Sequence, residues 1–318
     1  MFDKTERELY YFNKMNIKEI EPTTQNINER IFEEDLSIMV DEVVNLILKE
    51  LNKGRDENVR KQIVFDYVNK HKTNPQEIYN WLINNNQHNS NSIFLLGYFN
   101  YHGIDINTDM SKAYELYQKA AELENGAAQF ELANMCIDGE GSESDYEKAF
   151  ELTKKLAKKE CSCGMNLLGY CYEKGVGTDV NKQIAFELFQ KAADLGNIRG
   201  INNIAYCYEK GIGTSVNKKK AFESYQRAAD LGSANGINSL GICYEDGIGV
   251  DVDKQTAFKL YQKAINMGNH FALYNLALMY ECGNGIEKNV GQAIYWYEKS
   301  AEQGDLDAQN KLETLKTN

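Results

Sequence analysis

Seven cysteines are the residues of this 318-residue chain with the most specific chemistry, because thiols bind metals and form disulfides. Cys161 and Cys163 come nearest to a ligand pair, but one residue separates them and no second pair follows at the spacing of a zinc site. Cys171, Cys207 and Cys243 recur every 36 residues, as equivalent positions of a repeat do. We therefore expect these three side chains to be buried small apolar groups, and the sequence predicts no metal and no cofactor.

The sequence contains no recognisable catalytic motif either. The histidines lie far apart and at non-equivalent positions of the repeat: His71, His88, His102 and His270. The chain lacks Gly-x-Ser-x-Gly, His-Glu-x-x-His and a phosphate loop that ends in Gly-Lys-Ser/Thr. Its Gly-x-Gly pairs follow helical patterns rather than strands, which indicates turn residues with positive φ. The sequence predicts that the protein is not an enzyme.

A strict 36-residue period organises the chain around these residues. Six alanines mark it: Ala113, Ala149, Ala185, Ala221, Ala257 and Ala293. Glycines share a second register, at 103, 139, 175, 211, 247 and 283, and an Asp or Asn always follows six residues later. A constant period of this length predicts a stack of identical supersecondary units.

Each unit reads as two antiparallel helices. The invariant Asp or Asn is a helix N-cap, because its short side chain can accept an unpaired N–H of the first turn. After it, Ala113, Leu116 and Tyr117 lie on one helical face. In the preceding helix Leu168, Gly169 and Tyr172 form another stripe. The fold predicted is an all-α solenoid of six helix-pair repeats.

A family resemblance follows from one set of residues, present in six registered copies: Leu168-Gly169-x-x-Tyr172-x-x-Gly175-x-Gly177, then Ala185-Phe186 and Phe189-x-x-Ala192-Ala193-x-x-Gly196. Over about residues 92–312 this pattern resembles the Sel-1-like repeat family, 36-residue relatives of the tetratricopeptide repeat. The resemblance implies an α-solenoid that acts as an adaptor or scaffold for protein complexes. Secreted members of the family bridge consecutive units with disulfides, but the matching positions here include Ala193 and Ile201.

Charge and hydropathy narrow the class of partner. The net charge is −12, with 35 Lys and Arg against 47 Asp and Glu, which disfavours nucleic acid and anionic membrane as partners. Proteins, including extended or basic peptide segments, are the partners expected. The N-terminus shows no apolar signal segment, and no apolar run reaches the roughly 18 residues that span a bilayer. We expect a cytoplasmic protein.

Three regions are predicted. Residues 1–33 show no sustained period and form a flexible or loosely docked tail. Residues 34–91 form an N-terminal helical cap and linker, with apolar faces from Leu36 to Leu51 and from Val59 to Val68 and a third helix capped by Asn74. Residues 92–318 hold the array and a capping helix that turns Leu306, Leu312 and Leu315 inward.

The N-terminal linker resembles that of proteins with a protein-kinase domain ahead of such repeats. Kinase motifs are absent from this chain. Two functions therefore stay open. The first is a non-catalytic scaffold or adaptor that binds a partner peptide or protein in the concave groove. The alternative is a regulatory or targeting subunit whose N-terminal helices engage a kinase or another enzyme.

The side of the first helix opposite its core stripe is the candidate binding surface. Its residues recur by repeat as Asn166, Tyr170 and Glu173, as Asn202, Tyr206 and Glu209, and as Asn238, Ile242 and Glu245. We expect the asparagines to pair with a peptide backbone, the tyrosines to supply apolar contact and the glutamates to favour Lys or Arg; a solvated polar surface is the alternative. The first unit carries Phe94, Tyr98 and Tyr101 instead, either a second anchor or a surface that packs under the N-terminal helices.

Overall fold

The computed structural model describes residues 17–85 and 89–316, with side chains from residue 35 to residue 315, and it is all-α throughout these ranges. An N-terminal group comprises α2 (Ile17–Asn52), α3 (Glu57–Lys70) and α4 (Pro75–Asn85). Six helix pairs follow: α5 (Ser90–His102) and α6 (Met110–Glu122), α7 (Gly126–Asp138) and α8 (Tyr146–Lys158), α9 (Ser162–Lys174) and α10 (Lys182–Asp194), α11 (Ile198–Lys210) and α12 (Lys218–Asp230), α13 (Ala234–Asp246) and α14 (Lys254–Asn266), α15 (Phe271–Cys282) and α16 (Val290–Glu302). The last helix is α17 (Leu306–Lys316).

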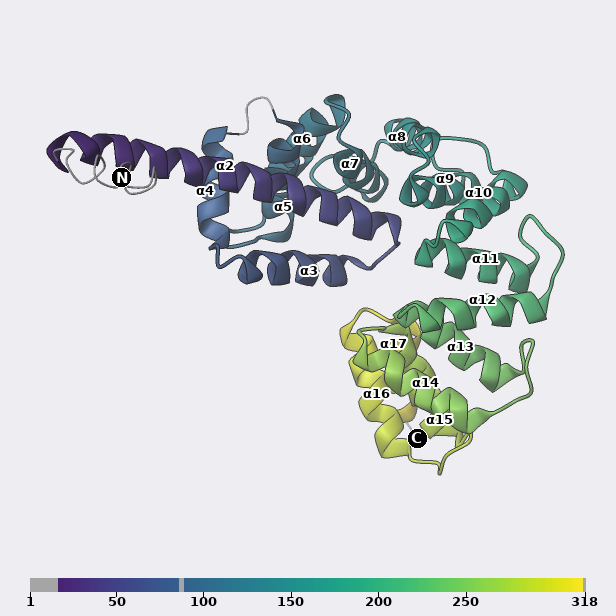
Figure 1. Cartoon of the computed structure of the whole chain (residues 1–318). Helices are drawn as coiled ribbons and strands as arrows, with labels where there is room; N and C mark the ends of the chain where they lie inside the picture. The colour runs from purple at the N-terminus through teal and green to yellow at the C-terminus, as the bar shows by residue number, and fades with distance from the viewer. Residues whose placement is uncertain (1–16, 86–88, 317–318) are drawn as a thin grey trace, which may run out of the picture.

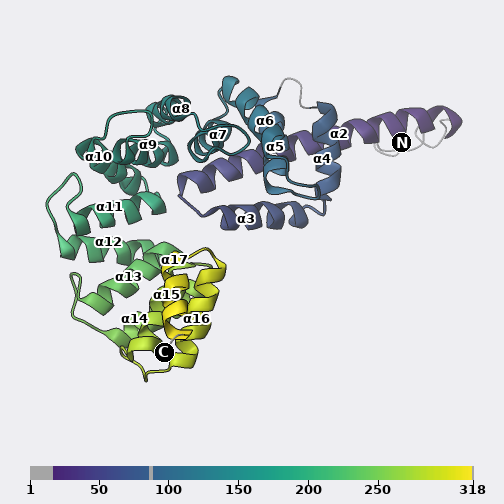
Figure 2. The same cartoon turned by 180° about the vertical axis from the view of Figure 1, so that it is seen from behind.

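The helix pairs follow one another along an arc, so the predicted solenoid is confirmed (Figure 1). Helix α2 crosses the first three units, where it contacts α5, α7 and α9, and its N-terminal end extends beyond the array (Figures 1 and 2). Helix α3 lies on the hollow side of the arc. We call the surface that the odd-numbered helices α5 to α17 present on this side the inner face.

The caps that the repeat predicts are present. Each second helix begins after an Asp or Asn whose side chain accepts the N–H three residues later: Asp109, Asp145, Asn181, Asn217, Asp253 and Asn289. The first helices α5, α7, α9, α11, α13 and α15 end at a left-handed glycine, as at Gly175 with φ +76°. A Cβ on Gly177 would lie 2.1 Å from the Tyr146 carbonyl oxygen, so the loop needs glycine for close approach as well.

Small residues let the helices pack closely, as the sequence predicts. The six alanines of the period are completely buried. A Cβ on Gly169 would lie 2.7 Å from the Phe189 ring, so the first and second helices of this unit approach at a point where only glycine fits. Edge-to-face aromatic pairs also recur in successive units, Phe150 with Tyr172 and Phe186 with Tyr208. Such contacts recur at equivalent positions of successive units along the arc.

The N-terminal region differs from its prediction in two ways. Residues 17–33, predicted to belong to the tail, are part of α2, while residues 1–16 of that tail lie outside the described residues. A helix that is anchored from Leu36 onward can extend without an apolar stripe of its own, so periodicity did not reveal this part. In α3 the buried face runs through Arg60, Val64 and Val68, and Val59 is exposed.

The ends of the array are close to the expected positions. Asn74 caps α4 by accepting the Gln76 N–H at 3.0 Å, as predicted. The array begins at Ser90 rather than residue 92, and residues 86–88 of the linker lie outside the described residues. In α17 the prediction for Leu306 is wrong, because its side chain is 70% exposed and Ala308 is buried instead. None of the described helices combines the length and apolar character that crossing a membrane requires.

Candidate protein-interaction surface

The predicted asparagine ladder joins neighbouring repeats to each other. Asn203 Nδ2 of α11 donates to Asn166 Oδ1 of α9 at 2.8 Å, and Asn275 Nδ2 of α15 donates to Asn238 Oδ1 of α13 at 3.0 Å. Asn202 Nδ2 donates to Ser233 Oγ, the N-cap of α13, at 2.8 Å. These bonds run across the inner face from one first helix to the next, so the asparagines hold the register of the repeats.

The Asn238–Asn275 pair still has hydrogen-bonding capacity left. Each side-chain amide carries both a donor and an acceptor, and this bond uses one group of each residue. Among the described residues, Asn238 Nδ2 has no acceptor and Asn275 Oδ1 has no donor. One donor and one acceptor therefore remain free on this hydrogen-bonded pair, which suits the C=O and N–H of a peptide backbone.

The glutamates of the predicted stripe bind core tyrosines. Tyr225 donates its hydroxyl to Glu209 at 3.0 Å, and Tyr261 donates to Glu245 at 2.7 Å. Burial, together with these carboxylates, raises the pKa of both tyrosines far above its ordinary value. Glu173 has no such partner, because Phe189 occupies the equivalent position, and it pairs with Lys174 at 2.7 Å. Sequence reasoning missed this bond, although its signal is a Tyr that follows the Glu by sixteen residues.

The tyrosines of the stripe are the part that faces solvent. Tyr170 is 37% exposed and Tyr206 is 43% exposed, at equivalent positions of α9 and α11. Ile242 continues the row on α13 and is half-buried. Neither tyrosine hydroxyl has a hydrogen-bond partner within the described part of the chain. The three side chains therefore form an apolar strip, along which the two tyrosine hydroxyls are free to bind a partner.

The aromatic cluster of the first unit is not an exposed anchor. Phe94 and Tyr98 are completely buried and Tyr101 is partly buried, with its hydroxyl donated to Glu140 at 2.7 Å. Phe94 also stacks on Tyr117, with ring centroids 5.4 Å apart. These residues belong to the core cluster that includes the apolar residues of α2, α3 and α4. The alternative prediction, packing under the N-terminal helices, is the one the structure supports.

An ion pair fixes α3 over this cluster. Arg60 is 4% exposed, and its guanidinium lies 3.0 Å from the Glu131 carboxylate of α7. Burial acts to lower the pKa of Arg60, but Glu131 together with Tyr98, Glu57 and Tyr117 keeps the pKa above its ordinary value. A second contact joins Glu57 of α3 to His102 Nδ1 at 3.3 Å, and the pKa of Glu57 is lowered mainly by this bond. Charge pairing therefore helps to hold the N-terminal helices on the inner face.

The turn between α2 and α3 binds the inner face through its backbone. The Asn52 carbonyl accepts from Ser162 Oγ at 2.6 Å and from Asn197 Nδ2 at 3.0 Å, and the Lys53 carbonyl accepts the Ile198 N–H at 2.9 Å. A Cβ on Gly54 would lie 2.6 Å from Asn197 Oδ1, so the chain approaches as closely as glycine permits. We call this turn, together with the array residues around it, the N-terminal seat; the array residues are Phe130, Cys163, Asn166, Asn197 and Arg199. Only a cavity of about 10 Å³ remains within it.

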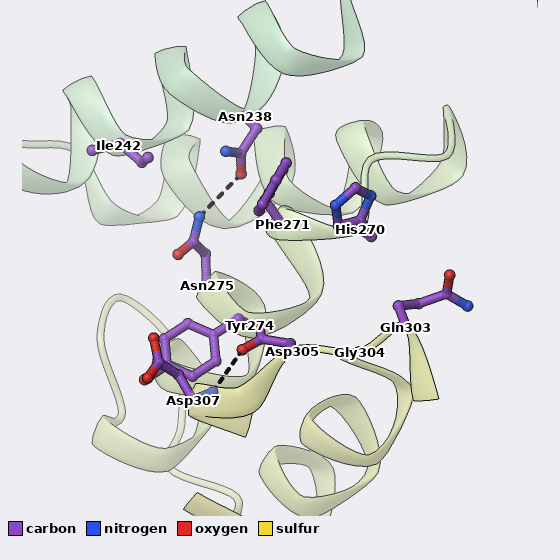
Figure 3. A pocket seen from close by; sticks show the side chains of 10 residues that line it. All are labelled: Asn238, Ile242, His270, Phe271, Tyr274, Asn275, Gln303, Gly304, Asp305 and Asp307. Carbon is purple, nitrogen blue, oxygen red and sulfur yellow. Dashed lines mark hydrogen bonds between the residues drawn. The ribbon is translucent and has the colours of Figure 1, made fainter. Parts of the chain in front are cut away.

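The far end of the inner face holds an open pocket of about 510 Å³. Residues of α13, of α15 and of the turn into α17 line it: Asn238, Ile242, His270, Phe271, Tyr274, Asn275, Gln303, Gly304, Asp305 and Asp307 (Figure 3). Phe271 is 59% exposed and Tyr274 is half-buried. The pocket therefore combines aromatic surface, the free groups of the asparagine pair and two carboxylates. We call it the C-terminal pocket.

The described cysteines and histidines are not gathered into a group that could hold a metal ion. Cys171, Cys207 and Cys243 are buried, as predicted, and burial raises the pKa of Cys207 and Cys243 to about 12. All seven cysteines are free, and the described residues contain no group of His, Cys, Asp or Glu that could hold a metal ion. His88 lies outside the described residues.

Comparison with known proteins identifies the repeats. The Sel1 repeat model matches six segments, residues 90–125, 126–161, 164–197, 198–233, 234–269 and 270–305. A Sel1 repeat protein from Oxalobacter formigenes is similar over 73% of this chain and 93% of its own, with 27% identity and a TM-score of 0.65. The protective antigen c5321 of uropathogenic Escherichia coli, which displays an SLR fold, is similar over 95% of this chain and 67% of its own, with 23% identity and a TM-score of 0.53. None of the curated proteins compared with this sequence matches it.

The six matched segments cover more than half of the sequence and coincide with the six helix pairs. The chain therefore belongs to the Sel1 repeat family. Repeats of this family generally mediate interactions between proteins.

Proposed function

We propose that this chain is a non-catalytic scaffold or adaptor that binds a partner protein on its inner face. The observation that carries the proposal is the exposure of Tyr170 and Tyr206 at equivalent positions of consecutive repeats. Tyrosine gives a partner a large rigid contact and a polar end, which is why it recurs in binding hot spots. The N-terminal helices cover the first units, so the open half of the inner face runs from Tyr170 to the C-terminal pocket.

Charge favours a basic partner. The chain carries net charge −12, and carboxylates at 173, 209, 245 and 281 follow the inner face. Lys174 and Lys210 pair with the first two of these, whereas Asp246 stands at the next equivalent position. Glu281 pairs with Lys311 at 3.0 Å, so among the described residues of this row Glu245 and Asp246 are the ones without an ion pair. The free thiols suit a reducing compartment and support a cytoplasmic location as part of this proposal.

Affinity purification with tyrosine variants tests this function. Tyr170→Ala combined with Tyr206→Ala should abolish recovery of the main partner, because both side chains are solvent-exposed on the proposed surface. Tyr146 and Tyr295 are exposed tyrosines of the second helices α8 and α16, so the same double substitution there is a matched control that should retain the partner. Equal recovery with both double variants would contradict binding on the inner face.

The alternative role as a regulatory or targeting subunit has one supporting observation. Ile38 of α2 and Val59 of α3 are exposed apolar residues on the N-terminal helices, at 58% and 43%. An enzyme, including a kinase, could dock there while the inner face binds a substrate. Ile38→Glu should then release the enzyme and leave other partners bound, whereas unchanged recovery of every partner counts against this role.

A further inference from the structure

The N-terminal seat and the C-terminal pocket occupy equivalent places in the array. Five array residues of the seat reappear, three repeats further along, as residues of the pocket. In order along the chain, the pairs are Phe130 and Asn238, Cys163 and Phe271, Asn166 and Tyr274, Asn197 and Asp305, and Arg199 and Asp307. One place is filled by the chain's own backbone and the other is open. The filled seat therefore shows how this surface holds a segment from outside the repeats.

The seat is lined by hydrogen-bond donors and a cation. Asn197 caps α11 through its Oδ1 and donates its Nδ2 to the Asn52 carbonyl. Arg199 lies 3.6 Å from the carboxylate of Asp56. The bound turn thus presents carbonyl oxygens and the Asp56 carboxylate to the Asn197 amide and the Arg199 guanidinium, while its own Arg55 donates to the Leu231 carbonyl at 2.9 Å.

The pocket reverses these polarities. Asp305 caps α17, where its Oδ1 accepts the Ala308 N–H at 3.1 Å and its Oδ2 accepts Ser300 Oγ at 2.8 Å, and a carboxylate has no N–H to give a carbonyl. Asp307 stands where Arg199 stands in the seat, and its exposed carboxylate has no ion-pair partner among the described residues. No Lys or Arg lines the pocket.

Apolar surface also increases from the seat to the pocket. Phe271 replaces Cys163, and Tyr274 replaces Asn166. Figure 3 shows Phe271 and Tyr274 on either side of Asn275, with Asp307 beside the tyrosine ring. Asn238 and Asn275 line the same pocket as these two aromatic residues, and the free donor of Asn238 and the free acceptor of Asn275 can take one peptide group.

We propose that the C-terminal pocket binds an extended segment of a partner protein that carries a Lys or Arg next to an aromatic or large aliphatic residue. The cation meets Asp307, the apolar side chain packs on Phe271 and Tyr274, and the main chain pairs with Asn238 and Asn275. This inference rests on the proposed scaffold function and specifies its ligand at one site.

Selection from a displayed library of random 12-residue peptides tests this ligand directly. The parent should enrich peptides with Lys or Arg beside an apolar residue. Fluorescence anisotropy of a selected peptide should then show affinity reduced about 3- to 5-fold by Asp307→Asn and about 10-fold or more by Phe271→Ala. Asp251→Asn, which alters an exposed aspartate in the loop between α13 and α14, should leave affinity unchanged.

Charge reversal gives the sharpest result. Asp307→Arg restores the cation of the seat and should shift the selection from basic to acidic peptides. Asp307 and Phe271 are exposed, so Asp307→Asn, Asp307→Arg and Phe271→Ala should each keep the parent's thermal unfolding midpoint within a few degrees. If Asp307→Arg is unstable, the affinities of Asp307→Asn and Phe271→Ala still test the proposal.

Four results would overturn the proposal. The parent enriches no basic apolar peptides, or the peptides keep their affinity for Asp307→Asn and Phe271→Ala. Self-association that Asp307→Arg abolishes would identify a second copy of this chain as the occupant. If instead the selected peptides depend on Tyr206 and not on Phe271, the pocket is wrongly assigned while the scaffold function stands.

Discussion

Removing one buried hydroxyl should weaken the contact between α13 and α14. Tyr261 is completely buried, and its hydroxyl donates to the Glu245 carboxylate at 2.7 Å. Tyr261→Phe keeps the ring and deletes this bond to a charged acceptor. Such bonds contribute about 1.5–3 kcal/mol. Because Glu245 is only half-buried, water can replace part of the bond, so we expect a loss of about 1–2 kcal/mol in unfolding free energy.

The chain supplies its own control. In the third unit Phe189 already takes the place of the tyrosine, and its glutamate, Glu173, keeps only the ion pair with Lys174, whereas Glu209 binds both Lys210 and Tyr225. Phe189→Tyr adds the missing hydroxyl, so it should raise rather than lower the free energy of unfolding, by up to about 1–2 kcal/mol. A double-mutant cycle of Tyr261→Phe with Glu245→Ala isolates the pair, and its coupling energy should be about 1–2 kcal/mol.

Urea denaturation followed by helical circular dichroism measures these differences, and hydrogen exchange of α13 and α14 localises them. Equal stability of Tyr261→Phe and the parent, with no coupling to Glu245, would show that the repeated Tyr–Glu bond does not stabilise the array.

Three further predictions follow from the core and its thiols. Burial raises the pKa of Cys171 to about 11 and of Cys207 and Cys243 to about 12, so the folded state holds these protons more tightly than the unfolded chain does. The free energy of unfolding should therefore be at its full value below pH 9 and fall above it, by about 1 kcal/mol per thiol at pH 10. In urea denaturation at a series of pH values, each Cys→Ala variant should show a shallower fall than the parent. Gly241→Val should disturb the fifth unit and spare the first in hydrogen exchange, because even a Cβ would lie 2.7 Å from the Tyr261 ring. Phe94→Ala should lower the free energy of unfolding by about 3–5 kcal/mol in urea denaturation, and a loss under 1 kcal/mol would contradict its burial.

The repeat itself could be predicted from sequence because each of its constraints is local. An N-cap such as Asp109 and a left-handed glycine such as Gly175 depend on residues a few positions away. The buried cysteines could be predicted for a related reason, since Cys171 stands beside a recognisable core stripe. Six copies of one pattern then fix the architecture.

The candidate site was harder to predict because its contacts join residues far apart in sequence. A helical wheel places Asn166 and Glu209 on the inner side but does not show that Asn203 and Tyr225 reach them from neighbouring helices. The burial of Phe94 likewise depends on helices that precede the array. Docking of the α2–α3 turn on α9 and α11 leaves no periodic signal at all.

Site-specific photo-crosslinking tests whether a partner protein binds the inner face. A photoreactive phenylalanine analogue placed at Tyr206 lies on the open inner face, whereas one at Glu223 lies on the exposed surface of α12. In cells, the scaffold account predicts a discrete crosslinked partner protein from position 206 and none from position 223. Crosslinking to the same partner from position 223 alone, or from both positions equally, would contradict binding on the inner face.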